Sequence, residues 1–186
     1  IVIGSPPCQG LSNEGKKLKN DKRNNLLQIF VDIVKKLNPD VWIFENVPGF
    51  KRLYGGFYFE NFCKDFNAST YKWNSFILNS SDYGVPQNRN RFIAIGSKHK
   101  KPSIPVATHC DNPNIFITKK KITLWEAISD LPVVEHGERA GVFEYGNEPT
   151  GIFQQYSRNG SEKVYNHTTQ THSNRVLDKI KSIPVG

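Results

Sequence analysis

The stretch IVIGSPPCQ (residues 1–9) joins a short β-branched run to an abrupt turn that carries a cysteine. Ile1-Val2-Ile3 is typical of a buried strand, and Gly4-Ser5-Pro6-Pro7 ends it. Cys8 therefore follows the carboxyl end of a strand, where open α/β sheets place their reactive groups. The lysine-rich residues 10–23 come next, and positive charge favours the thiolate form of cysteine. The pattern indicates a nucleophile beside a cationic loop, with a small buried cysteine as the alternative when Pro-Cys stands alone.

A second apolar strand ends in polar residues. Val41-Trp42-Ile43-Phe44 leads directly into Glu45-Asn46, and between the two strands residues 24–38 place apolar side chains at helical spacing. Strand, helix and strand form a right-handed crossover, so the strands are expected to be parallel and adjacent. Cys8 and Glu45 then lie at the same edge of the sheet. Glu45 is placed there for acid–base catalysis, unless it only caps the next turn.

Two arginines precede a third apolar run, at residues 92–96. Gln87, Arg89 and Arg91 alternate, so in an extended chain their side chains point the same way. The strand that follows gives the arginines a rigid base, which suits an anionic or carbonyl-bearing ligand. A solvated cluster of surface charges is the alternative.

The remaining pattern predicts a sheet followed by a connector. Strands at residues 73–78 and 91–96 are expected to pair antiparallel at the edge of the sheet, after a helix at residues 57–66. Beyond residue 98 the chain is rich in Pro, Asn, Thr and Gly, which predicts little core of its own. Short helices are expected there at residues 124–129 and 174–182.

The order Pro-Cys-Gln, Glu-Asn-Val and Gln-x-Arg-x-Arg before an apolar strand resembles the cytosine-C5 DNA methyltransferase family, in its bacterial modification-methylase form. The resemblance implies an α/β fold: part of the Rossmann-like fold of S-adenosylmethionine-dependent methyltransferases, here the second half of the sheet. It also implies two regions. Residues 1–97 would be the catalytic half of the methyltransferase domain, and residues 98–186 a connector and the beginning of the target-recognition region.

The resemblance further implies methyl transfer from S-adenosylmethionine to carbon 5 of cytosine in double-stranded DNA, through a covalent adduct with C6. Cys8 matches the nucleophile, and Glu45 the residue that holds the ring N3 and the exocyclic amine. Arg91 matches the arginine that reaches O2, and Arg89 one that supports the same pocket. The target base must be flipped out of the duplex. The residues matched to DNA contact are Gln9, Ser12, Arg23, Asn46 and Gln87.

The main S-adenosylmethionine site is expected outside this chain. In the family a glycine-rich turn and an acidic residue hold the cofactor, and both precede the Pro-Cys-Gln strand with which this sequence begins. Pro7 and Leu26 match positions that edge the cofactor. We therefore interpret the chain as a piece of a larger enzyme, inactive alone, whose strand at residues 1–4 has an unpaired apolar edge.

The charge of the chain fits a polyanionic partner. Its net charge is +8 with a pI near 9.4, and the basic residues gather at residues 16–23, 98–101 and 119–121. The sequence contains no apolar run of membrane-spanning length and no signal peptide pattern, so a cytoplasmic location is expected. No metal site is expected, since Cys110 lacks companions at ligand spacing. A monomeric complete enzyme and a cognate restriction endonuclease are the other implied features.

Three alternatives stay open. A thiol hydrolase needs a histidine base, and none of the five histidines lies at a strand end as Cys8 and Glu45 do. A catalytically inactive methyltransferase-like DNA-binding module is compatible with the missing cofactor motifs, although the intact candidate residues argue against decay. A tRNA cytosine-C5 methyltransferase of the same fold shares Pro-Pro-Cys-Gln, whereas Gln87 and the Gly10-Leu11-Ser12 continuation look more like the bacterial DNA enzymes.

Overall fold

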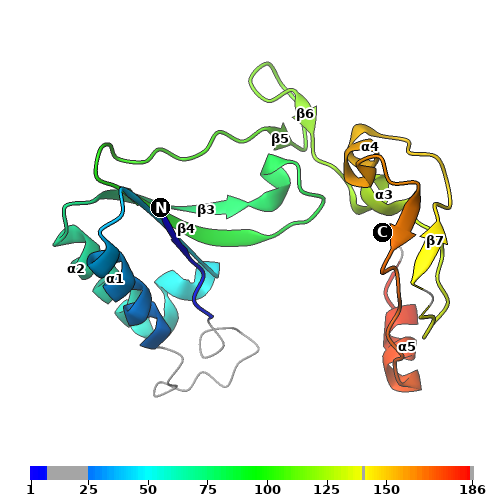
Figure 1. The fold of residues 1–186 in the computed structure, drawn as a ribbon, viewed down its shortest axis with the longest axis horizontal. Helices are drawn as coiled ribbons and strands as arrows, with labels where there is room; N and C mark the ends of the chain where they lie inside the picture. The colour runs from blue at the N-terminus through cyan, green and yellow to red at the C-terminus, as the bar shows by residue number, and fades with distance from the viewer. Residues whose placement is uncertain (8–24, 140, 185–186) are drawn as a thin grey trace. The chain divides into compact units, whose positions relative to one another are not determined.

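The computed structural model describes residues 1–7, 25–139 and 141–184. The chain divides into two compact units, residues 1–121 and 122–186 (Figure 1). Residues 98–121 pack with the first unit, and the functional boundary that the sequence predicts near residue 98 remains a prediction. Among the described residues, no helix has the length and apolar character needed to cross a membrane.

The first unit is built on a four-stranded mixed sheet. Its strands are Val2–Gly4 (β1), Val41–Asn46 (β2), Lys72–Asn79 (β3) and Asn90–Ser97 (β4). Their order in the sheet is β1-β2-β4-β3. β1 and β2 are parallel, and β4 runs antiparallel to both β2 and β3. The predicted crossover and the predicted antiparallel pair at the sheet edge are therefore both confirmed.

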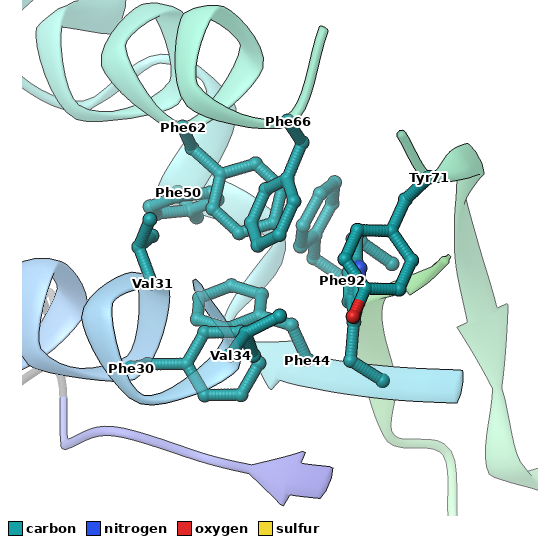
Figure 2. Close-up of a cluster of buried hydrophobic side chains, with 11 residues drawn as sticks. Phe30, Val31, Val34, Phe44, Phe50, Phe62, Phe66, Tyr71 and Phe92 are labelled. Atoms are coloured by element: carbon teal, nitrogen blue, oxygen red, sulfur yellow. The ribbon is translucent and has the colours of Figure 1, made fainter. Parts of the chain in front are cut away.

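Helices α1 (Asn25–Leu37) and α2 (Phe57–Asn67) cover one face of this sheet. Alternation along β2 and β4 sends Trp42, Phe44, Phe92 and Ala94 to that face, where all four are fully buried. Figure 2 shows aromatic side chains from both helices and both strands meeting in one cluster. The cluster consists of Phe30, Val31, Val34, Trp42, Phe44, Phe50, Phe62, Phe66, Tyr71, Phe92 and Ala94.

Trp42 lies at the centre of this core and requires a glycine on the neighbouring strand. Its ring stacks on Phe66 with centroids 4.0 Å apart, and it stands opposite Gly96 in the β2–β4 register. A Cβ atom added to Gly96 would lie 2.2 Å from the Trp42 ring. The close approach of strand and indole therefore depends on the missing side chain.

We expect Gly96→Ala to lower the free energy of unfolding by about 1–3 kcal/mol, because the buried Trp42 ring cannot move away without displacing its neighbours. Urea unfolding followed by tryptophan fluorescence measures the change. Gly49→Ala is the matched control, since nothing lies within 4 Å of its added Cβ. Equal stability of the two variants would contradict this account of the core.

The edge strand β1 differs in part from its prediction. It forms a strand as expected, but Ile1 and Ile3 are 82% and 71% exposed, whereas the apolar run predicts burial. Ile3 pairs with Ile43, so it points to the sheet face opposite Trp42 and the two helices, and Ile1 shares that face. β2 is the partner of β1 on one side, and its other side has none among the described residues. The unpaired apolar edge that the sequence predicts for residues 1–4 is thus present in this part of the chain.

The connector after β4 folds back on the first unit. It contains β5 (His109–Cys110) and β6 (Lys119–Lys120), which form a short parallel pair. β5 lies against the 3₁₀ helix η4 (Ser80–Tyr83), whose turn leads into the segment before β4. The sequence did not predict this small sheet.

The described residues of the second unit form three helices and a strand pair. Its elements are α3 (Leu124–Ile128), β7 (Val142–Glu144), α4 (Ile152–Arg158), β8 (Lys163–Tyr165) and α5 (Asn174–Lys181). The helices predicted at residues 124–129 and 174–182 are confirmed, whereas α4 and the β7–β8 pair were missed. A buried ion pair between Arg158 and Asp130 at 2.9 Å, with the Arg158 guanidinium over the Tyr145 ring, gives this unit a polar centre.

Candidate active site

Glu45 lies at the end of β2, where three strands bring their polar residues together. The pleat turns it to the sheet face opposite Trp42 and Phe44, and its side chain is 29% exposed. Its Oε1 accepts a hydrogen bond from Nε of Arg91 at 2.8 Å, and its Oε2 accepts one from the Ser5 hydroxyl. The carboxylate therefore links the chain after β1, the end of β2 and the start of β4.

The contact between Ser5 and Glu45 confirms that β1 and β2 end at the same edge of the sheet. Pro7, the last described residue before the gap, lies two residues beyond that contact. Four sequence-predicted site residues fall outside the described part of the chain, so their positions stay predictions: Cys8, Gln9, Ser12 and Arg23.

Arg91 is fixed by the strand that carries it. It pairs with Leu78 across the β3–β4 ladder, and its guanidinium also donates to the carbonyl oxygen of Asn90 at 2.8 Å. Its side chain is 24% exposed, so part of the guanidinium stays open to a ligand while Nε holds Glu45. The structure thus brings together two of the predicted catalytic residues.

Arg89 lies just before β4, on an exposed segment with a fixed backbone. Its amide donates to Oδ1 of Asn79 at 3.0 Å, and its carbonyl oxygen accepts from the Ser80 amide at 3.1 Å. Gln87 lies in a bend, where its amide donates to the carbonyl of Val85 at 2.7 Å. The predicted extended segment therefore does not include Gln87, because the turn after Gly84 extends that far, and a shared direction of Arg89 and Arg91 remains a prediction.

Asn46 shapes the turn that follows β2. It is 4% exposed, and its Oδ1 accepts a hydrogen bond from the Val47 amide at 2.8 Å. This local bond ends the strand and leads the chain into the 3₁₀ helix η2 (Pro48–Lys51). Burial indicates a positioning role for Asn46 beside Glu45, and its predicted contact with DNA remains a prediction.

Sequence reasoning missed a set of contacts between the connector (residues 98–121) and the segment that leads to Arg89. We call this set of contacts the brace. The Thr108 amide donates to the Asp82 carbonyl at 2.9 Å, and the Tyr83 hydroxyl donates to the carbonyl of Pro105 at 3.0 Å. The His109 ring lies so close to Gly84 that an added Cβ would come within 2.6 Å of it. The glycine in Asp82-Tyr83-Gly84 was the available signal, since its φ of +87° permits this turn.

Lys121 completes the brace with charge. Its ammonium lies 3.1 Å from Asp82 and 3.0 Å from Asp111, so it joins η4 to the loop after β5. Hydrogen bonds to Asp111 and Asp82 raise the pKa of Lys121. The turn before Arg89 is therefore held from two sides, by β3 through Asn79 and by the connector.

A mainly apolar hollow lies between β1 and α1, next to Ser5. Its volume is about 310 Å³. Pro7 and Leu26, the two residues matched to the cofactor edge, both line it, together with Val2, Ile3, Gly4, Ser5, Pro6, Ile29, Phe30 and Ile33. These residues can contact the apolar side of a cofactor. They supply no carboxylate, so the polar contacts of a complete cofactor site must come from elsewhere.

The two described cysteines lie on elements other than β1, β2 and β4, which bring Ser5, Glu45 and Arg91 together. Cys63 is half-buried on α2, and burial raises the pKa of its thiol. Cys110 lies in β5, where its thiol donates to the Asn112 carbonyl at 3.1 Å. A raised pKa disfavours the thiolate, so Cys63 is a poor candidate nucleophile.

A sequence model of the C-5 cytosine-specific DNA methylase family matches residues 1–183. The chain belongs to this family. Type II methyltransferase M.DdeI from Desulfomicrobium norvegicum is 38% identical over the whole chain, which covers 45% of that protein. Type II methyltransferase M.BspRI from Lysinibacillus sphaericus is 37% identical over 70% of the chain and 31% of its own length. The chain thus spans less than half the length of these relatives.

The fold of this methylase chain has a counterpart among solved structures. A prophage-encoded protein from E. coli, described as a candidate DNA modification methyltransferase, superposes with a TM-score of 0.69 and 22% identity. The match covers 99% of this chain and 55% of the other. At this identity the likeness establishes the fold, and it confirms the predicted partial α/β methyltransferase architecture.

Proposed function

We propose that an enzyme containing this chain transfers a methyl group from S-adenosylmethionine to carbon 5 of cytosine in double-stranded DNA. The observation that carries the proposal is the convergence of Ser5, Glu45 and Arg91 at one edge of the sheet, within a chain of the C-5 cytosine-specific methylase family. Three strand ends supply this edge, so its geometry is rigid. Pro7, beside the edge, is joined directly to Cys8.

Cys8 acts as the nucleophile in this proposal. Its thiolate adds to C6 of the flipped cytosine, so a C6–S bond forms and the C5–C6 π electrons make C5 nucleophilic toward an electrophilic methyl group. After C5 has gained its methyl group, release of the C5 proton to solvent expels the thiolate and restores the C5–C6 double bond. The basic residues that follow Cys8 in the sequence favour the thiolate and meet the DNA phosphates.

Glu45 and Arg91 bind the polar edge of the base. Glu45 holds the proton at N3 and accepts from the exocyclic amine, which makes C6 electrophilic when the thiolate approaches. Arg91 reaches the carbonyl O2 and offsets the negative charge that the addition places on the ring. The 2.8 Å bond between Arg91 and Glu45 supports this division of roles, because it holds both groups at one site with part of each exposed.

S-adenosylmethionine supplies an electrophilic methyl group when bound. Pro7 and Leu26 would line one side of it in the apolar hollow beside Ser5. The glycine-rich turn and the acidic residue that hold its polar groups in the family would belong to another part of the enzyme. A cognate restriction endonuclease fits the naming of the relatives as Type II methyltransferases.

The test is product formation on defined substrates. We expect an active enzyme that contains this chain to generate 5-methylcytosine in duplex DNA, detected by nucleoside mass spectrometry, and to leave tRNA unmodified. The isolated 186-residue chain, assayed in parallel, is expected to form no product, because its hollow offers mainly apolar contacts to the cofactor. Product in tRNA alone would favour the tRNA-modifying branch, and DNA binding without product would favour an inactive module.

A further inference from the structure

The loop between β5 and β6 exposes two large apolar side chains at its tip. Ile115 and Phe116 are each 87% exposed, and Figure 1 shows the loop projecting beyond the two short strands. Two adjacent apolar side chains with this exposure form a small apolar surface, and contiguous apolar surface of this kind is used at interaction sites. We refer to Ile115 and Phe116 together as the apolar tip.

The apolar tip is held by a turn with several hydrogen bonds. Oδ1 of Asn114 accepts from the amides of Phe116 and Ile117 at 2.9 and 3.0 Å. The Asn114 amide donates to the Ile117 carbonyl at 2.8 Å, and the Cys110 thiol approaches the same carbonyl at 3.7 Å. The exposure of Ile115 and Phe116 is therefore built into the turn.

The surface beside the apolar tip is positively charged. Lys119 and Lys120 follow it on β6, and both are exposed. Asp111, the acidic residue of the same segment, forms an ion pair with Lys121 at 3.0 Å. The charge that remains next to the tip is thus positive, and it complements a polyanion.

The brace ties the β5–β6 pair, which carries the apolar tip, to η4 and Gly84. Lys121 bonds to Asp82, Thr108 bonds to the same η4 segment, and His109 lies on Gly84. η4 leads through the turn to Arg89, and all of these elements belong to the first compact unit. The loop and Arg89 are therefore attached to the same 3₁₀ helix, η4.

We propose that the β5–β6 loop is a duplex DNA contact, in which Lys119 and Lys120 bind phosphates and the apolar tip packs against sugars and base edges in a groove. The proposal rests on the proposed function, because it takes duplex DNA as the substrate. Apolar side chains flanked by basic residues are used in this way by proteins that insert wedges into the minor groove. Phosphate contacts set position and salt dependence.

The test measures the binding of a fluorescein-labelled duplex by anisotropy at several salt concentrations, using an active enzyme that contains this chain. Ile115→Ala with Phe116→Ala should weaken binding about tenfold without changing the slope against salt. Lys119→Gln with Lys120→Gln should weaken binding and reduce that slope by about 2, roughly one for each phosphate that a lysine no longer neutralises.

Matched controls separate the loop from general surface effects. Val133→Ala with Ile152→Ala removes two apolar side chains that are 92% and 85% exposed in the second unit. Lys36→Gln with Lys64→Gln removes two exposed charges from α1 and α2. Both controls are expected to bind DNA as the wild type does.

The measurements distinguish a wrong loop proposal from a wrong proposed function. Wild-type affinity and salt slope in both loop variants would overturn the loop proposal, and an accompanying fall in melting temperature would show that the tip packs against protein instead. In that case the wild type would still bind and methylate DNA, so the proposed function would stand. A wild type that neither binds nor methylates DNA would overturn the proposed function as well.

Discussion

We expect an active enzyme that contains this chain to trap a duplex with 5-fluorocytosine at the target position as a complex that survives denaturants. Cys8→Ala is expected to abolish this trapping. Fluorine at C5 cannot leave as a proton does, so the C6–S bond formed by the thiolate persists after methyl transfer. The variant keeps the backbone and the charges around the site, so DNA binding should stay within about threefold of wild type. Denaturing gel electrophoresis measures the trapped fraction, and anisotropy measures binding.

Cys110→Ala is the matched control for this experiment. It removes a thiol from the same compact unit, and that thiol bonds to the Asn112 carbonyl in the loop after β5. Cys63 is a poor rival for the nucleophile, because burial raises the pKa of its thiol. Trapping should therefore remain complete in Cys110→Ala. A trapped complex in Cys8→Ala would assign the nucleophile to another residue and refute the proposed role of Cys8.

The sequence predicted the sheet well because its signals are local. The apolar run before Glu45 and the helical spacing of residues 24–38 each define one element, and the handedness of crossovers then makes β1 and β2 parallel neighbours. It could not predict that Ile1 and Ile3 would be exposed. The exposure of side chains on an edge strand depends on what lies beside that strand in the fold. An apolar run has the same sequence pattern in an edge strand as in an interior strand.

The sequence predicted the members of the site better than their arrangement. The sequence named Glu45 and Arg91 but did not predict that Ser5 bonds to Glu45, and the ion pair between Glu45 and Arg91 depends on rotamers and register. Gln87 was placed in an extended segment because alternation cannot reveal a turn that continues past Gly84. Asn46 is buried and accepts the bond from the Val47 amide that shapes the turn after β2, and its predicted contact with DNA remains a prediction.

Long-range contacts explain most of what the sequence could not predict. The brace joins Asp82 and Gly84 to residues more than twenty positions later in the chain, and no periodic pattern marks the pairing of β5 with β6. The second unit likewise holds itself together through Arg158 and Asp130. A polar pair of this kind leaves no periodic pattern of apolar residues in the sequence, which is why α4 was missed.

We expect Glu45→Gln to reduce the rate of methyl transfer a hundredfold or more while changing the DNA dissociation constant by less than about threefold. Gln keeps one oxygen for Nε of Arg91 and presents its amide NH₂ to Ser5, whose hydroxyl can also accept, so the two contacts and the local shape should be retained. It cannot hold or release a proton at N3, so the loss falls on the chemical step, where acid–base groups contribute about a hundredfold to ten-thousandfold.

Single-turnover kinetics with saturating DNA separate this loss from binding. Glu60→Gln, on the exposed side of α2, makes the same chemical change away from the site and should keep the wild-type rate. Melting temperatures check that both variants fold equally well. A Glu45→Gln rate within about threefold of wild type would count against the acid–base role. A large loss of DNA affinity with an unchanged single-turnover rate would show instead that Glu45 acts in binding the substrate, and the ion pair with Arg91 would then be the feature that positions the DNA.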